Sequence, residues 1–361
     1  MKRFDCSCGA RVFFENTGCL SCGSELGFLP DVGRVSALTL DPFGEYVAAA
    51  NPEQRYRKCQ NYAQEGVCNW MVPVAEQNPL CQACRLNQVI PNLSDPDNRD
   101  KWARVEAAKR RLVYSLNRLR LPLVPRSVDP EHGLGFDIKS DTPESRVLTG
   151  HADGLVTLNL AEADPVLREQ MRLAMQERYR TLLGHFRHEI GHYYWDLLIA
   201  PSERLAAFRE LFGDEQADYG EALKAHYANP PGVDTTGQFV SAYAKAHPWE
   251  DWAETWAHYL HMVDTLETAQ SFGFSNGPRA DAETSVLGAP FERLIEAWLQ
   301  LTIALNGMNR SMGLPDAYPF QIGDGVKGKL SFVHETVLEQ ARLDKEKEKV
   351  APSQSSDPQA A

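Results

Sequence analysis

Gly184-His-Phe-Arg-His188-Glu189-Ile-Gly-His192-Tyr-Tyr-Trp195 contains two histidines four residues apart, with a glutamate directly after the first. On a helix this spacing places both imidazoles on one face, about 6 Å apart along the axis. Two imidazoles so placed can bind one tetrahedral Zn²⁺ at about 2.0–2.1 Å each. Glu189 can then reach the metal-bound water without binding the metal. The stretch therefore predicts a catalytic zinc site; the alternative is a pair of structural histidines on a helix.

The residues before this motif predict one long helix. Asp164 and Pro165 are residue types favoured at a helix N-terminus, and the next proline is Pro201. Apolar residues recur at helical spacing. They are Val166, Leu167, Met171, Leu173, Met175, Tyr179, Leu182, Leu183, Phe186 and Ile190. We expect this helix to be buried on two sides.

A second helix is predicted to begin near Pro248, which suits a first helical turn. Glu250 and Glu254 then lie one turn apart on the same face. Together with His188 and His192, Glu250 would complete three protein ligands and leave the fourth position to water. Glu254 could accept a hydrogen bond from the second nitrogen of a ligand histidine and orient its ring. Spacing alone does not decide between the two glutamates. We expect the histidines at 185, 247, 258 and 261 to lie at the surface or behind the ligands.

All eight cysteines lie in the first 84 residues, in two groups of four. The first group forms two short-spaced pairs with glycines beside them, the pattern of a zinc ribbon. Its members are Cys6, Cys8, Cys19 and Cys22. The second group, in which only the last pair is regularly spaced, consists of Cys59, Cys68, Cys81 and Cys84. Cysteines in a cytosolic chain indicate metal sites rather than disulfides. We predict two structural zinc ions; the alternative is free or redox-active thiols.

Composition limits the class of protein. With 361 residues, 43% of them hydrophobic, the chain can form two or three domains with a sizeable core. It has no apolar run that would serve as a signal peptide or membrane span, so we expect a cytoplasmic protein without a membrane partner. The net charge of −12 argues against a nucleic-acid binder as a whole. Residues 99–126, with nine basic and two acidic residues, indicate either an anionic partner or a solvated helix face.

We predict the α+β class, with a mainly helical domain and a small sheet behind a cysteine-rich region. Five parts are expected along the chain. They are a zinc ribbon (1–32), a second four-cysteine region (33–95), a basic amphipathic helix or linker (96–125), a mainly helical domain around the zinc motif (126–340) and a disordered tail (341–361).

Residues 154–160 alternate between apolar and polar positions as a strand does, and residues 150–153 are expected to form the turn before it. A strand at this place in the chain can be the sheet edge on which an extended substrate pairs. The alternative is a buried structural strand.

Over residues 1–340 the sequence resembles a bacterial family of zinc-binding metallopeptidases with an N-terminal zinc ribbon, most specifically at 179–196 and 247–260. The catalytic segment is also similar to anthrax lethal factor and the Mlc titration factor peptidases, in which a glutamate of a Glu-x-Phe-Ala segment is the third ligand. The resemblance implies a gluzincin-like, zincin-type domain with Glu250 as that ligand, although Trp252 replaces the phenylalanine. In lethal factor a tyrosine seven residues earlier faces the zinc, which implies this position for Tyr243.

These features predict a zinc peptidase with one catalytic and two structural zinc ions, acting on a peptide or protein. Zinc would lower the pKa of its water toward about 7. Glu189 would take the water proton and pass it to the leaving amine, and Tyr243 would donate to the developing oxyanion. The alternative is a zinc-ribbon adaptor that binds protein or nucleic acid through residues 1–126, with an inactive or regulatory peptidase-like part.

Overall fold

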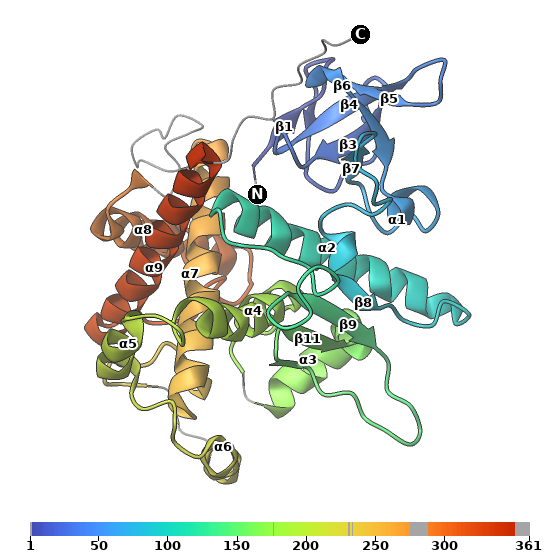
Figure 1. Ribbon diagram of the computed structural model, residues 1–361. Coiled ribbons are helices and arrows are strands. Elements are labelled where there is room, and N and C mark those ends of the chain that lie inside the picture. The colour runs from blue at the N-terminus through green and yellow to red at the C-terminus, as the bar shows by residue number, and fades with distance from the viewer. Residues whose placement is uncertain (1, 176, 230–231, 233, 275–287, 351–361) are drawn as a thin grey trace.

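The computed structural model describes residues 2–175, 177–229, 232, 234–274 and 288–350 (Figure 1). Helices dominate the described residues, and the sheets are small. A region containing all eight cysteines precedes the helical part. The predicted α+β class, with a cysteine-rich N-terminal region, is therefore confirmed.

The cysteine-rich region contains two antiparallel sheets. The first pairs β1 (Phe4–Asp5) with β2 (Arg11–Val12). The second has the order β3-β4-β5-β6-β7, formed by β3 (Glu25–Leu29), β4 (Arg34–Leu40), β5 (Tyr46–Ala48), β6 (Asn51–Lys58) and β7 (Met71–Pro73). A short helix, α1 (Gln60–Ala63), follows β6. Because β3 and β4 pair, one sheet continues across the expected boundary at residue 32. The five-part division of the chain stays a prediction.

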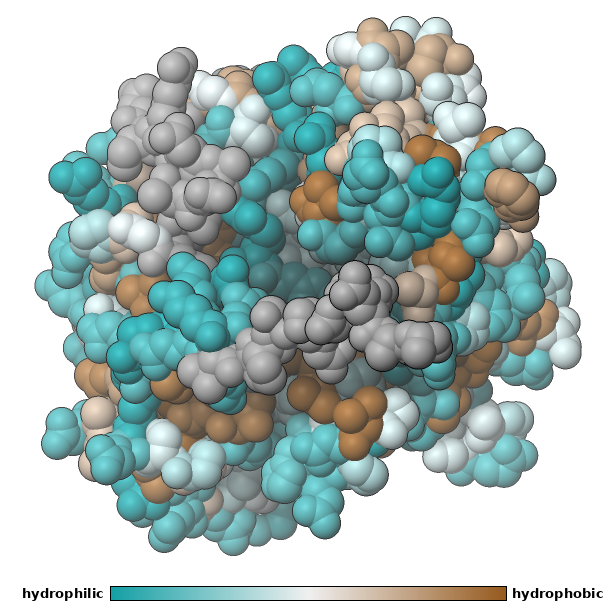
Figure 2. Space-filling view, turned by 45° about the horizontal axis from the view of Figure 1, so that its top comes forward, coloured by the Kyte–Doolittle hydropathy of each residue, from teal (hydrophilic) through white to brown (hydrophobic). Residues whose placement is uncertain are grey.

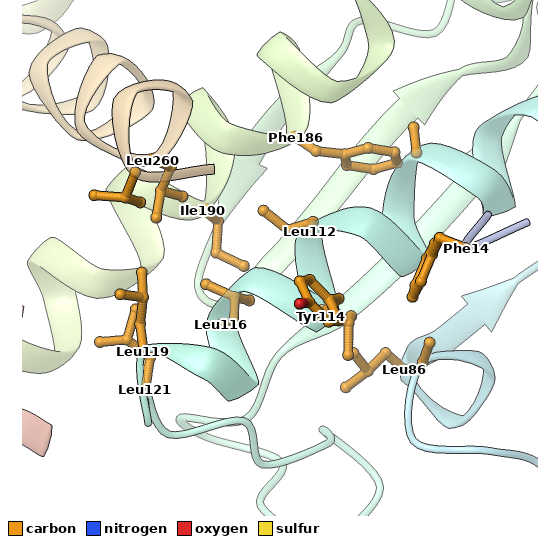
Figure 3. Close-up of a cluster of buried hydrophobic side chains, with 14 of the residues drawn as sticks. Phe14, Leu86, Leu112, Tyr114, Leu116, Leu119, Leu121, Phe186, Ile190 and Leu260 are labelled. Atoms are coloured by element: carbon orange, nitrogen blue, oxygen red, sulfur yellow. The ribbon is translucent and has the colours of Figure 1, made fainter. Parts of the chain in front are cut away.

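Helix α2 (Pro96–Arg118) lies between the cysteine-rich sheet and the helices that follow (Figure 1). It begins where the Asp95 side chain accepts a hydrogen bond from the backbone N–H of Asp97 at 3.1 Å. Its apolar residues are buried against both neighbours (Figure 3). On one side, the ring of Tyr114 lies 5.3 Å from that of Phe14. On the other side, α2 packs against the helix of the zinc motif.

Three basic residues of this stretch have partners within the chain. Lys109 is fully buried and pairs with Glu106 at 2.8 Å. Arg110 is also buried and donates to a backbone carbonyl. Arg111 pairs with Glu15 of the cysteine-rich region at 2.5 Å. The expected solvated face is therefore wrong for Lys109 and Arg110, which are buried, whereas the Arg111 side chain is partly exposed.

A four-stranded sheet has the order β10-β11-β9-β8, with β8 (Asn87–Val89), β9 (Gly135–Lys139), β10 (Gly150–Ala152) and β11 (Leu155–Asn159). The strand predicted over 154–160 is confirmed as β11, but it lies inside the sheet. The neighbouring edge strand is β10, which covers residues predicted to form a turn; β8 is the opposite edge. Asp153 and Gly154 form the turn, with φ of 48° and 78°. Asp-Gly is a strong hairpin signal, and it was the clue to this pairing.

The single helix predicted to run from Pro165 into the zinc motif is wrong. α3 (Pro165–Ala174) begins as predicted at Asp164, but α4 (Leu182–Leu198) is a separate helix. Thr181 caps α4 by accepting a hydrogen bond from the backbone N–H of Gly184 at 2.9 Å. The cap competes with continuation of the helix. Apolar periodicity runs across the break and therefore conceals it.

The remaining helices are α5 (Arg204–Phe212), α6 (Tyr219–Ala228), α7 (Pro248–Ser271), α8 (Phe291–Ser311) and α9 (Asp324–Val350). Short 3-10 segments are η1 (Cys84–Leu86), η2 (Leu160–Ala163) and η3 (Tyr243–Lys245). The predicted disordered tail is wrong for residues 341–350, which continue α9. Lysine and glutamate are good helix formers. Near the C-terminal end of α9, Glu348 forms a salt bridge with Arg120 at 2.9 Å. Residues 351–361 lie outside the described residues.

The surface face in Figure 2 is largely hydrophilic, with hydrophobic side chains in separate patches. Among the described residues, no helix combines the length and apolar character needed to cross a bilayer.

Helices α4 and α7 approach each other closely at Gly191, inside the zinc motif. A Cβ atom at this position would lie 3.0 Å from Cα of Ala253 and 3.2 Å from Cβ of Trp256. The indole N–H of Trp252 donates to the carbonyl of Gly191 at 2.8 Å. This approach sets the distance between the two helices that carry the candidate ligands.

Gly191→Ala is expected to force α4 and α7 apart and to lower the free energy of unfolding by about 1–3 kcal/mol, the usual cost of overpacking. Gly307→Ala in α8 is the matched control, because nothing lies within 4 Å of a Cβ atom there. Helix propensity should make that variant more stable by up to about 1 kcal/mol. Denaturant unfolding measures both changes. A stabilised Gly191→Ala variant would contradict the close approach.

Candidate metal centre

His188 and His192 project from α4 and meet Glu250 from the first turn of α7. Their ligand atoms lie within 4.8 Å of one another. Oε2 of Glu250 is 3.0 Å from Nε2 of His188 and 3.5 Å from Nε2 of His192. The structure thus brings the three predicted ligands together. Of the two glutamates that spacing left open, Glu250 is the one in this cluster.

This donor set fits a zinc ion. Oε2 of Glu250 is buried and has no hydrogen-bond partner among the described residues. A buried carboxylate oxygen needs a compensating charge or donor. Burial alone would raise the pKa of Glu250, but His188 and His192 outweigh it and hold that pKa well below its usual range. Two imidazoles and one carboxylate form a ligand set of catalytic zinc sites and leave a position for water.

Glu254 contacts the other nitrogen of His188. Its Oε1 lies 2.8 Å from Nδ1 of that ring. The ring is therefore held between two carboxylates, with Nε2 directed at Glu250. A carboxylate behind a ligand histidine fixes the tautomer and the orientation of the ring.

Glu189 and Tyr243 line the same cavity as His188. This cavity has a volume of about 500 Å³ and lies between α4, α7 and the segment before η3. The ring centroids of Tyr243 and His188 are 5.9 Å apart. Burial and the nearby Glu250 raise the pKa of Tyr243 well above its usual value, so its hydroxyl stays protonated. Both predicted catalytic side chains therefore lie beside the candidate ligands.

Three aromatic side chains complete the site. The hydroxyl of Tyr219 donates to Oε1 of Glu250 at 2.5 Å. Trp249 and His151 lie against His192, with ring centroids 4.2 Å and 6.2 Å from it. Burial lowers the pKa of His151 to about 3, so this ring is neutral near physiological pH. No sequence motif contains Tyr219 or His151, whereas Trp249 stands next to Glu250 and could have been noticed.

The other histidines near the motif have other partners. His185 pairs with Glu162. His247 caps α7 by accepting a hydrogen bond from the backbone N–H of Trp249 at 3.1 Å. Nδ1 of His258 is 2.7 Å from the hydroxyl of Tyr318. Clusters of potential metal ligands among the described residues do not include these histidines.

The cysteines form two clusters, composed of the two predicted groups of four. Sulfur atoms are 3.7 Å apart between Cys6 and Cys22, and 3.8 Å apart between Cys68 and Cys81. Four thiolates around a tetrahedral zinc at about 2.3 Å would be about 3.8 Å apart. The second cluster is fully buried, and the backbone N–H of Trp70 donates to the sulfur of Cys68 at 3.4 Å. Both clusters therefore have the dimensions of structural zinc sites.

Comparisons with known proteins agree with this geometry. Residues 98–336 match a family model described as "Putative zinc-binding metallo-peptidase". The chain belongs to this metallopeptidase family. Residues 3–95 match a zinc-ribbon domain, so the resemblance inferred from the sequence is confirmed for both parts.

The chain also has relatives in mycobacteria. Uncharacterized proteins of Mycobacterium bovis and of two Mycobacterium tuberculosis strains are 45% identical over 343 residues, which cover 94% of this chain and 96% of theirs. No solved structure matches the chain.

Proposed function

We propose that this metallopeptidase hydrolyses peptide bonds at a zinc ion held by His188, His192 and Glu250. The observation that carries the proposal is the position of Oε2 of Glu250, which faces both imidazoles beside a cavity of about 500 Å³. A zinc ion bound there would lower the pKa of a water ligand and polarise the scissile carbonyl. The stoichiometry of one catalytic and two structural zinc ions belongs to the same proposal.

The protein's own side chains handle the protons. Glu189 takes a proton from the attacking water and delivers it to the leaving amine nitrogen. The hydroxyl of Tyr243, kept protonated by its raised pKa, donates to the oxyanion that develops on the carbonyl. Glu254 keeps Nδ1 of His188 protonated and thereby leaves Nε2 free to bind the metal.

An extended peptide or protein segment fits beside this site. β10 is the edge of its sheet, and its His151 stacks on the candidate ligand His192. Pairing with an edge strand binds a peptide backbone without regard to its sequence. The cavity continues from Thr149, directly before β10, and has the volume of a pocket for side chains.

Cleavage of a mixed-sequence peptide library tests the proposal, with new N-termini detected by mass spectrometry. The zinc-loaded protein should cleave peptides. A chelator that removes the ion from the histidine site should stop cleavage, and added zinc should restore it. A protein that contains all three zinc ions and cleaves neither peptides nor an unfolded protein would contradict the proposal.

Binding of a protein or nucleic acid through the zinc-ribbon region stays a prediction, as does the cytoplasmic location. The cations of α2 that pair within the chain provide no support for nucleic-acid binding. Filter binding at two salt concentrations tests the nucleic-acid case, since such a complex must weaken as salt rises.

A further inference from the structure

The two carboxylate oxygens of Glu250 have different surroundings. Oε2 faces the two imidazole nitrogens at 3.0 and 3.5 Å. Oε1 accepts a hydrogen bond from the hydroxyl oxygen of Tyr219, which lies 2.5 Å away. With Oε1 engaged in this way, the carboxylate presents a single oxygen to the metal position. We infer that Tyr219 is a positioning residue that holds Glu250 as a one-oxygen metal ligand, an inference that rests on the proposed zinc site.

The ring of Tyr219 is held independently of its hydroxyl. It packs edge-on against His247 and Trp249, with centroids 5.2 Å and 5.9 Å away. Nε2 of His247 lies 3.1 Å from the carbonyl of Ala217, which ties the chain before α6 to the start of α7. Tyr219→Phe therefore keeps these ring contacts and removes only the hydrogen bond to Glu250.

Loss of this hydrogen bond matters because Glu250 is 1% exposed. A surface carboxylate would replace a lost donor with water, whereas an acceptor this deeply buried does so poorly. Oε1 would then either turn toward the metal position or stay buried without a hydrogen-bond donor. Removal of a group that orients a ligand in this way typically weakens metal binding by about 10–100-fold. The core should be unaffected, since α6 contains no buried residue.

The test measures zinc affinity of the full chain by competition with a chromophoric chelator. Tyr219→Phe should weaken binding of the most weakly held zinc by about 10–100-fold. Tyr227→Phe is the matched control on the same helix, because the hydroxyl of Tyr227 contacts Tyr243 rather than Glu250. Its zinc affinity should equal that of the wild type.

A second background separates positioning from a general effect on folding. In a Glu250→Ala protein, Tyr219→Phe should cause no further loss of zinc affinity, because the side chain on which it acts is absent. An equal loss in both backgrounds, or wild-type affinity in Tyr219→Phe itself, would overturn the inference and leave the zinc site intact. A wild-type chain that binds zinc only at its cysteines would overturn the proposed function as well.

Discussion

Glu189→Gln is expected to lower the rate of peptide cleavage by about 10²–10⁴-fold, the usual contribution of a positioned proton-transfer group. The side chain directly follows the proposed ligand His188 and lines the cavity, but it is not in the cluster of candidate ligands. Glutamine has the same shape and cannot accept the proton of the attacking water. The variant should therefore keep its full zinc content. Cleavage rates and zinc content, measured on the same preparation, give both results.

Glu221→Gln is the control for the loss of one negative charge near the site. Glu221 lies on α6, is exposed and pairs with Lys224. Its variant should cleave peptides within a few-fold of the wild-type rate. Equal turnover by Glu189→Gln and the wild type on any peptide substrate would refute the role of Glu189.

Cys84→Ala is expected to release one zinc ion and to lower the free energy of unfolding by several kcal/mol. Structural zinc contributes about 10–16 kcal/mol of apparent binding energy in small zinc-finger peptides, and a larger fold retains part of its stability without it. Cys84 and its three partners are buried, and no disulfide joins them. Loss of one thiolate would leave three others to be satisfied in a region with little water.

The destabilisation should extend to the metallopeptidase part. Ser115 of α2 donates to Asp264 of α7 at 2.6 Å, and Asp264 also pairs with Arg187 of α4. Cys8→Ala is the comparison variant: it also removes a candidate zinc ligand, but Cys8 is exposed whereas Cys84 is buried. Denaturant unfolding, followed by tryptophan fluorescence, should show the larger loss for Cys84→Ala. Unchanged unfolding of that variant would contradict a structural role of the second cluster.

The clusters of candidate metal ligands could be predicted in part because the spacing of their members is local. Helical spacing alone places His188 and His192 on one face, and short cysteine spacings define the zinc ribbon. The choice of Glu250 over Glu254 was not local. Both lie on one face of α7, and only the packing of α7 against α4 at Gly191 determines which carboxylate faces Nε2 of both imidazoles.

Other features depended on contacts between distant segments and could not be predicted. Tyr219 reaches Glu250 across 31 residues. Arg110 is buried and donates to the carbonyl of Val67, a contact that its own helix pattern does not reveal. The break before α4 was local, but the apolar periodicity outweighed the weaker signal of a threonine cap at Thr181.

The most direct test of the proposed catalytic metal site is the zinc content of the purified wild type and of His192→Ala. Elemental mass spectrometry measures it. Three ligand clusters occur among the described residues, so the wild type should bind three zinc ions per chain and the variant two. The same zinc content in both proteins would show that the imidazoles and Glu250 do not hold a metal ion.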